Sequence, residues 1–463
     1  MATVCFAATS AHADDWTFDP FIGSSEQFTD NVNSTTSGEE SDFVTTIDLG
    51  FDLIGETRRT ELDISYKFSQ DYYAEHSELN GYRQNLIANG NIEILDDHFY
   101  VDGRLTFTEE NLGSTGSTSA GDRTQSGGRT QVFNGNISPY YVQDFGTWAT
   151  AVARYGYSET RFLEADVGDD GAPPADQRTN EFQINLESGI HFSDYKWAWD
   201  NSILSSESDV GESFVHILSM GTAEFPINRL FSLIGTLGYD DFDADDIDDS
   251  EVSGLFGGAG IRFHPSSRTD VSFQIGYRFG DVVYDADLSY SPTSQDTITG
   301  SYVVSVQSAD QSLANTDLLD AEGELIQPEF SSTTYVDDVT KTKALRLSWT
   351  GSRGRNDYGL STSFIDREVL STDSTDRVVS IDGNFDRQLT PRANLAFNAG
   401  FSDVVDGQTV SEEENVTRFG TTYVYEFGNG LIGTAAYDFL ERQNATSGDI
   451  TENSFTISIK KTF

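Results

Sequence analysis

Apolar and polar residues alternate with a period of two over many short stretches of the chain. Near the C-terminus Phe455, Ile457, Ile459 and Phe463 share one face of an extended strand, while Ser, Thr and Lys occupy the other face. A strand that crosses a bilayer needs about 9 to 11 residues, apolar at every second position. The alternation therefore predicts membrane-spanning strands. The same pattern recurs in the stretches 62–68, 99–107, 271–279, 379–385 and 395–401.

The connections between these stretches are alternately short and long. Short turn signals include Asp96-Asp97, Gly351 to Arg353 and Gly428-Asn429-Gly430, the last of which carries the Asn-Gly step that favours tight hairpins. Long segments rich in Gly, Ser, Thr, Asp and Glu, such as 111–128, lie between them. A soluble β-sandwich would show the same period of two. Short turns that alternate with long loops are instead typical of bacterial outer-membrane barrels.

The chain is therefore predicted to be all-β: a transmembrane antiparallel up-and-down β-barrel in the outer membrane of a Gram-negative cell. Counting strands between connections gives roughly 22, within a range of roughly 18 to 24, and an even number places both termini on the periplasmic side. Residues 14–463 are predicted to form this barrel. Residues 1–13 are interpreted as a signal peptide remnant, because this small, apolar stretch ends in Ala11-His12-Ala13, which resembles a cleavage site.

Composition narrows the choice of partners. The 76 acidic residues outnumber the 28 basic ones, and the formal net charge of −48 opposes binding to the phosphates of a nucleic acid and to anionic membrane surfaces. Mean hydropathy is −0.41, and no stretch approaches the roughly 20 apolar residues of a spanning helix. Any membrane span must be made of strands, so the expected partners are outer-membrane lipid and lipopolysaccharide.

Charged residues on the polar face of the predicted strands are candidates for function, since substitutions in a barrel lumen tune what a pore passes. The same residues could instead form internal ion pairs that stabilise the wall, and the sequence leaves both interpretations open. The predicted lumen-lining residues are Glu61, Asp63, Lys67, Glu93, Arg104, Glu181, Glu187, Arg278, Arg346 and Asp382.

An acidic run over 240–251 offers the hard oxygen ligands that Ca²⁺ prefers. The spacing does not fit an EF-hand: counted from Asp241, the sixth position is Asp246 rather than Gly and the twelfth is Val252 rather than Glu. A solvated loop is the favoured interpretation, and loose binding of divalent cations is the alternative. Its candidate ligands are Asp241, Asp243, Asp245, Asp246, Asp248 and Asp249.

No motif points to catalysis. None of the histidines after residue 13 has an evident base and orienting partner beside it in the sequence, as a catalytic group requires. The chain is therefore predicted not to be an enzyme and to need no cofactor. The histidines considered are His76, His98, His191, His216 and His264.

Several segments resemble a known family. The terminal Phe463, at the end of an alternating strand, resembles the signal read by the barrel assembly machinery. The segments PFIGSSEQFTDNV (20–32), SDFVTTIDLGFDLIG (41–55), QNLIANGNIEILDDHF (84–99), GRNDYGLSTSF (354–364) and LTPRANLAFNAGF (389–401) are similar to outer-membrane barrels associated with PEP-CTERM and exosortase systems. That resemblance implies a link to extracellular polysaccharide and partners among its export components, and it implies no catalytic residues.

These observations lead to four functional hypotheses. The first is a porin-like conduit or assembly component for polysaccharide export. The second is a structural or adhesive surface barrel whose acidic loops bind cations or partners. A gated receptor-transporter and a barrel hydrolase rank below both, because receptors of this kind have a globular plug before the first strand and no such segment precedes Trp16. The long segment 309–337 is the candidate gate or lumen plug.

Overall fold

The computed structural model describes residues 15–111, 129–163, 176–193, 195–209, 213–244, 252–308, 339–406, 414–444 and 448–463. The predicted signal peptide remnant, the segment 309–337 and Asp245, Asp246, Asp248 and Asp249 lie outside these residues. The strands are β1 (Asp15–Thr29), β2 (Asp42–Glu56), β3 (Thr60–Tyr73), β4 (Gly81–Leu95), β5 (Phe99–Asn111), β6 (Arg129–Asp144), β7 (Ala149–Leu163), β8 (Gln177–Ser188), β9 (Lys196–Ser208), β10 (Phe214–Pro226), β11 (Phe231–Ala244), β12 (Gly254–Ser266), β13 (Thr269–Arg278), β14 (Asp281–Tyr290), β15 (Asp296–Ser308), β16 (Val339–Arg353), β17 (Asn356–Val369), β18 (Ser374–Thr390), β19 (Ala393–Asp406), β20 (Glu414–Gly428), β21 (Leu431–Asn444) and β22 (Ile450–Thr462). Two short 3₁₀ helices, Ser77–Leu79 and Ile190–Phe192, complete the elements, and none of the described helices is long and apolar enough to cross a membrane.

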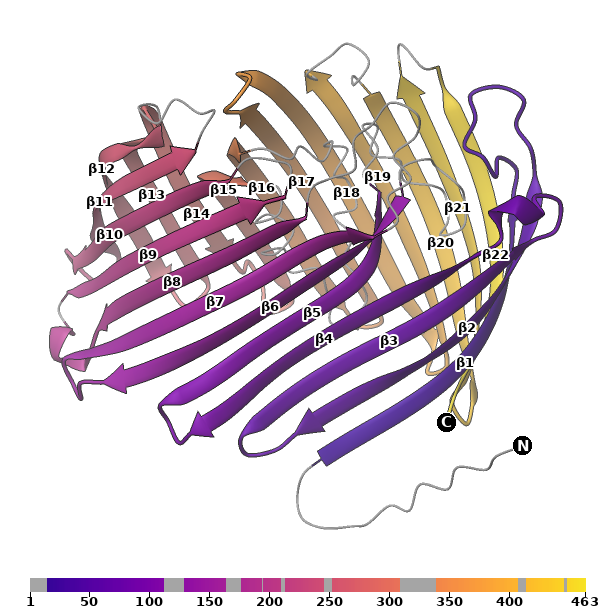
Figure 1. The fold of residues 1–463 in the computed structure, drawn as a ribbon, viewed down its shortest axis with the longest axis horizontal. Coiled ribbons are helices and arrows are strands. Elements are labelled where there is room, and N and C mark those ends of the chain that lie inside the picture. Colours follow the sequence, from indigo (N-terminus) through magenta and orange to yellow (C-terminus); the bar gives the residue numbers. More distant parts are fainter. Residues whose placement is uncertain are drawn as a thin grey trace.

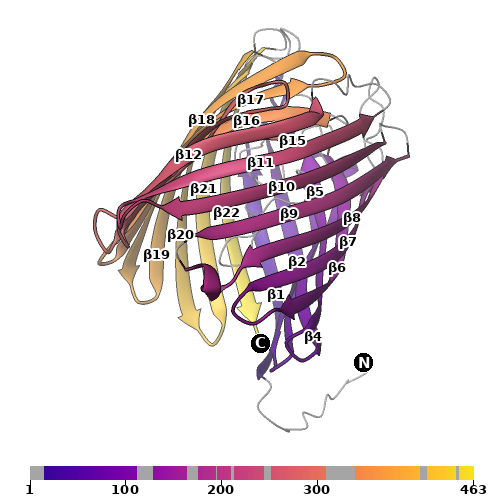
Figure 2. The same cartoon turned by 90° about the vertical axis from the view of Figure 1, so that its left-hand side faces the viewer.

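Each strand pairs antiparallel with its neighbours in the sequence, and β22 pairs with β1, so the sheet closes into a barrel of 22 strands. Figures 1 and 2 show the strands inclined around the ring, with the start of β1 and the end of β22 at the same end. Closure leaves no sheet edge along the lipid, which is the condition for a β-structure to span a bilayer. The predicted fold is confirmed, and the barrel belongs in the outer membrane.

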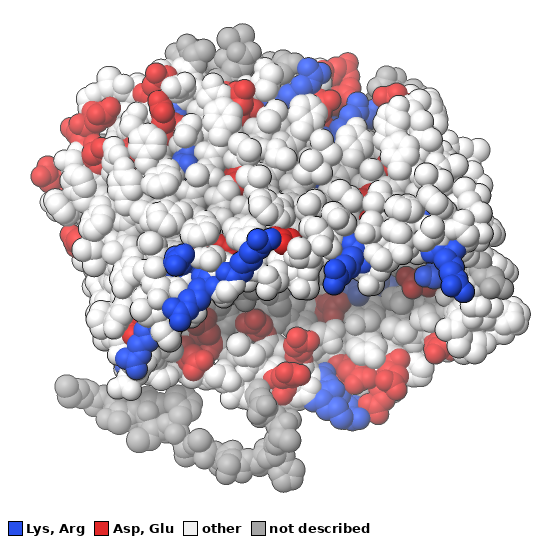
Figure 3. Space-filling model, turned by 180° about the vertical axis from the view of Figure 1, so that it is seen from behind, with Lys and Arg blue, Asp and Glu red and all other residues white. Residues whose placement is uncertain are grey.

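The two faces of the wall differ as the alternation predicts. On β1 the side chains of Trp16, Phe18 and Ile22 are exposed on one face, whereas Gln27 and Thr29 on the other are buried. Uncharged surface covers the middle of the outer wall in Figure 3, and charged residues gather mainly toward its two edges. The apolar band is the surface that meets lipid.

Glycine and asparagine make the sharpest turns. The predicted hairpin between β20 and β21 is present, and Gly428, Asn429 and Gly430 all have positive φ, the left-handed region that Gly and Asn tolerate best. The predicted turn at 351–353 is wrong. Strand β16 continues to Arg353, and the chain turns at Gly354, whose φ is 68°.

One junction in the ring is much weaker than the rest. Strands β14 and β15 share five paired positions, Ala286 to Tyr290, whereas β1 and β22 share nine. The extracellular half of β14 therefore has no hydrogen-bonded partner on its β15 side. We call this β14–β15 junction the overlap seam, because the strands on its two sides overlap there instead of lying edge to edge.

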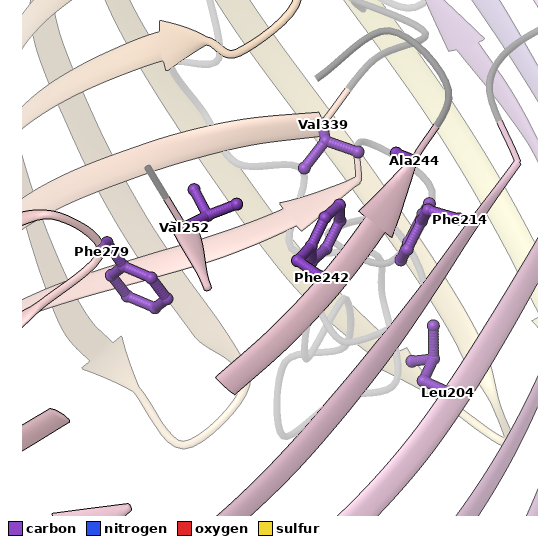
Figure 4. Close-up of a cluster of buried hydrophobic side chains, with 7 residues drawn as sticks. All are labelled: Leu204, Phe214, Phe242, Ala244, Val252, Phe279 and Val339. Carbon is purple, nitrogen blue, oxygen red and sulfur yellow. The ribbon is translucent and has the colours of Figure 1, made fainter. Parts of the chain in front are cut away.

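The overlap is visible in which side chains meet. Phe214 on β10 and Phe242 on β11 point into the lumen, and both are buried. They belong to one apolar cluster with Val339 at the start of β16, against which Val304 on β15 also packs. On β16 Val339 is on the same face as Leu345, and on β15 Val304 is on the same face as Tyr302. Leu345 and Tyr302, which lie nearer the short-turn end, face outward. The extracellular ends of β15 and β16 therefore lie inside those of β10 and β11 (Figure 4).

Candidate functional site

The inner wall of the barrel is the candidate site. Residues paired across antiparallel strands share a face, so the lumen side can be followed from strand to strand by register. On β3 the half-buried apolar positions alternate with the exposed Asp63 and Lys67, and the pairing of Lys67 with Asn85 carries the lumen face to β4. The register places all the predicted lumen residues on this inner face: Glu61, Asp63, Lys67, Glu93, Arg104, Glu181, Glu187, Arg278, Arg346 and Asp382.

These residues do not form one cluster. Glu93 at the short-turn end accepts hydrogen bonds from the backbone N–H of Asp97 at 2.6 Å and from the Tyr100 hydroxyl at 3.4 Å. Arg278 lies near the opposite end and is tightly paired. The others are spread around the circumference on β3, β5, β8, β16 and β18.

A buried ion-pair network around Asp240 is the strongest polar feature of the lumen. Its carboxylate, 1% exposed, accepts hydrogen bonds from Arg278 Nε at 2.7 Å and Arg278 Nη2 at 2.9 Å. The ring nitrogen Nε2 of His216 lies 3.2 Å from Asp240 Oδ1. The Arg278 guanidinium also stacks 4.3 Å from the ring centroid of Phe256. This network sits beside the overlap seam and fixes the position of Arg278.

The acidic run is therefore not a loop over its whole length. Strand β11 continues to Ala244, so Asp240, Asp241 and Asp243 belong to a strand. Asp240 faces the lumen, and Asp241 and Asp243 lie on the opposite, outward face because side chains alternate. The prediction that the acidic loop begins at Asp240 is therefore wrong, because residues 240–244 belong to β11. Among the described residues no group of three or more His, Cys, Asp or Glu side chains could hold a metal ion.

Several other lumen arginines are held by carboxylates. Arg154 Nη1 donates to Asp102 Oδ2 at 2.7 Å, and its guanidinium lies 4.2 Å from the Tyr140 ring centroid. Arg83 Nε donates to Asp71 Oδ2 at 3.0 Å. Arg367 pairs with Asp376, and Arg262 pairs with Asp270 and Glu224. Paired arginines stabilise the wall and contribute little net charge to the lumen.

Carboxylates remain in excess after this pairing. Inward-facing carboxylates that have no Lys, Arg or His within 4 Å among the described residues include Glu61, Asp63, Glu181, Glu187, Asp285 and Asp287. Fewer inward-facing cations lack a carboxylate partner there, and they include Lys67, Lys196, Arg346 and Lys460. The unpaired charge of the described inner wall is therefore negative.

No protein-family model matches the chain, and no curated protein does. Solved structures match over almost its whole length. The FrpB iron transporter from Neisseria meningitidis aligns with a TM-score of 0.55 at 11% identity, over 96% of this chain and 82% of that one. The ferric enterobactin receptor PfeA aligns with a TM-score of 0.55 at 10% identity, over 96% and 81%, and PfeA is from Pseudomonas aeruginosa. The copper transporter OprC aligns with a TM-score of 0.50 at 11% identity, over 96% and 80%.

These structures correct the functional ranking made from the sequence. A polysaccharide conduit or assembly component came first there, and a receptor-transporter ranked below it. The matching barrels are transporters and receptors, so that ranking is wrong. It relied on the expectation of a globular plug before the first strand, whereas the likeness lies in the barrel itself. The resemblance to exosortase-associated barrels stays a prediction.

Proposed function

We propose that this barrel is the membrane part of an outer-membrane receptor or transporter that admits a cationic, metal-bearing solute. The observation that carries the proposal is the excess of unpaired carboxylates on the inner wall, such as Glu181, Glu187, Asp285 and Asp287. A lumen of one sign with low-dielectric walls concentrates ions of the opposite sign. The likeness to iron and copper transporters supports a metal-bearing cargo.

The described part of the wall suits attraction better than chelation. A bare divalent ion needs several carboxylate or carbonyl ligands at one point, and the described residues provide no such group. Carboxylates spaced along several strands would guide a hydrated ion or a cationic complex through the lumen without holding it tightly. This arrangement favours passage over storage.

The test is the ion selectivity of the purified barrel in a planar bilayer under a salt gradient. The reversal potential should show preference for cations, and Glu181→Gln with Glu187→Gln should reduce it. The matched control is Glu159→Gln, because Glu159 faces outward and bonds to Arg161 Nε at 2.8 Å. Selectivity for anions in the wild type, or equal loss in the control, would contradict the proposal.

A further inference from the structure

The short turns of one half of the barrel carry an unexpected charge. The six turns from the β10–β11 turn to the β20–β21 turn contain no carboxylate, although acidic residues outnumber basic ones 76 to 28 in the whole chain. Four of these turns carry an exposed arginine: Arg229, Arg268, Arg355 and Arg392. The distribution runs against the composition, so it calls for a specific partner.

Two further arginines lie beside these turns on the lipid-facing side. Arg353 shares the outward face of β16 with Trp349, and Arg387 shares that of β18 with Phe385. Together the six form a set that we call the arginine row: Arg229, Arg268, Arg353, Arg355, Arg387 and Arg392. Basic residues follow the lower edge of the wall in Figure 3, which shows this half of the barrel.

Most of the arginine row has no acidic partner. Arg353 Nη2 lies 3.3 Å from Asp296 Oδ2, whereas Arg387 bonds to Asn356 Oδ1 at 3.1 Å and Arg355 to the carbonyl of Leu389 at 3.2 Å. Among the described residues no carboxylate lies within 4 Å of Arg229, Arg268 or Arg392. Five of the six guanidinium groups therefore have no carboxylate partner among the described residues and can bind an anion outside the barrel, and Arg353 is the exception.

Aromatic residues place the row at the height of lipid headgroups. All five tryptophans lie within a few residues of the short-turn end, and Trp349 and Trp148 are among those exposed on the surface. Aromatic girdles mark the membrane–water interface of outer-membrane barrels. Arg353 and Arg387 project from the lipid face just beyond this girdle, so their charged ends reach the phosphate layer. A protein that approached from the periplasm would meet only the turn tips.

We infer that the arginine row binds the anionic phosphate headgroups of glycerophospholipids in the periplasmic leaflet, and that it does so on one half of the barrel only. The β2–β3 turn on the opposite half differs, because Arg58 and Arg59 are ion-paired to Asp96 of the β4–β5 turn. Lipids with net negative headgroups, such as phosphatidylglycerol, would be enriched next to β10–β21. Basic residues near a membrane surface attract such lipids with an affinity gain of about fivefold each.

Tryptophan fluorescence can test this on each half separately. Two variants of the full chain keep one tryptophan each, Trp349 beside the row or Trp148 on the other half, with the remaining tryptophans changed to Phe. In vesicles, brominated phosphatidylglycerol should quench Trp349 more strongly than brominated phosphatidylcholine, and high salt should remove the difference. Trp148 should be quenched equally by both lipids.

Arginine variants complete the test. Arg355→Gln with Arg387→Gln, which removes two arginines without a carboxylate partner, should abolish most of the preference at Trp349, by about fivefold in relative affinity for each arginine. Arg58→Gln with Arg59→Gln should leave it unchanged, and a heat-modifiable band on gels confirms that each variant has folded. Equal quenching of Trp349 by the two lipids in the wild type, or a preference that survives loss of both arginines, would overturn the inference and leave a periplasmic protein as the partner.

Discussion

The two seams of this barrel are held together by opposite chemistry. At the closing seam, β1 meets β22 through nine paired positions, and polar side chains join its extracellular end. Thr29 donates to the buried Glu452 at 3.0 Å, and the backbone and side-chain N–H groups of Asn453 donate to Asp30 at 2.7 and 2.8 Å. At the overlap seam the five pairs between β14 and β15 are supplemented by the buried apolar cluster around Phe242.

The difference shows two ways to close a wall. The hydrogen bonds of Thr29 and Asn453 to Glu452 and Asp30, which we call the polar latch, need matched donors and acceptors in fixed register, so they hold strands edge to edge. An apolar cluster needs only contact area, so it can hold strands that lie one behind the other. The overlap seam therefore has fewer backbone hydrogen bonds between strands and more buried apolar side chains. The ends of β15 and β16 that lie inside the wall narrow the extracellular end of the lumen.

The largest effect is expected from emptying the apolar cluster. Phe242→Ala should lower the free energy of unfolding by about 3 to 5 kcal/mol, because it leaves a cavity against Phe214, whose ring centroid is 5.0 Å away. The midpoint of urea unfolding, followed by the heat-modifiable band, measures the loss. Leu237→Ala on the same strand is the control, since Leu237 is 70% exposed. Equal losses in the two variants would show that the cluster does not hold the seam.

Removing one side chain of the polar latch should lower the free energy of unfolding less than removing one side chain of the apolar cluster. Asn453→Ala removes the side-chain hydrogen bond to Asp30, which is charge-assisted, and should cost about 1.5 to 3 kcal/mol. The same urea titration applies. Thr45→Ala, which removes an exposed hydrogen bond to Glu26, should change stability by less than about 0.5 kcal/mol. A loss at Asn453 larger than that at Phe242 would reverse the comparison.

Substitutions of Phe279 can distinguish the contribution of packing from that of backbone strain at the overlap seam. Phe279 has a φ of 56° in the two-residue turn between β13 and β14, a position where Asn is preferred, yet its ring belongs to the apolar cluster. Phe279→Asn should lose about 1.5 to 3 kcal/mol of burial and regain about 1 to 2 kcal/mol of strain, for a small net loss. Phe279→Ala keeps the strain, so it should unfold at lower urea than Phe279→Asn. The opposite order would show that the turn is unstrained.

The smallest effect concerns pH on the closing-seam side. His76, in the connection between β3 and β4, lies 2.9 Å from Asp42 and 2.8 Å from Glu40, and these hydrogen bonds raise the pKa of His76 above its usual value. A raised pKa in the folded state stabilises the connection fully below the unfolded value of about 6.5 and loses this contribution as pH rises through the folded pKa. Hydrogen exchange at residues 74–80 should therefore speed up across that range beyond its intrinsic pH dependence. His76→Gln should remove the extra pH dependence, and an unchanged profile would refute the role of His76.

The strands could be predicted from the sequence because each one repeats a local rule. Alternation and turn chemistry report on neighbouring residues, so the barrel and its 22 strands followed from them. The overlap seam could not be predicted in this way. By alternation Val304 and Val306 look like lipid-facing residues, whereas in the structure they are partly buried against the apolar cluster, because the end of β15 lies inside β10 and β11.

The candidate site was harder for the same reason. Alternation places Glu181 or Arg346 on the polar face without reference to the rest of the chain. Whether a lumen charge is paired depends on residues far away in the sequence, as Asp240 and Arg278 are 38 positions apart on strands that are not adjacent. Composition made Asp240 look like part of a solvated loop. The one available signal was the continued alternation of Gly238, Asp240 and Phe242.

Closure of the ring has a kinetic consequence. The bond between Thr29 and Glu452 joins residues 423 positions apart, whereas every other neighbouring pair of strands is joined by a much shorter connection. The entropy of closing a loop grows with the logarithm of its length, so a span of this size costs about 3 kcal/mol more than a hairpin, roughly five doublings of length. Hairpins should therefore form early and the first and last strands should meet late, which makes that meeting the slow step of assembly.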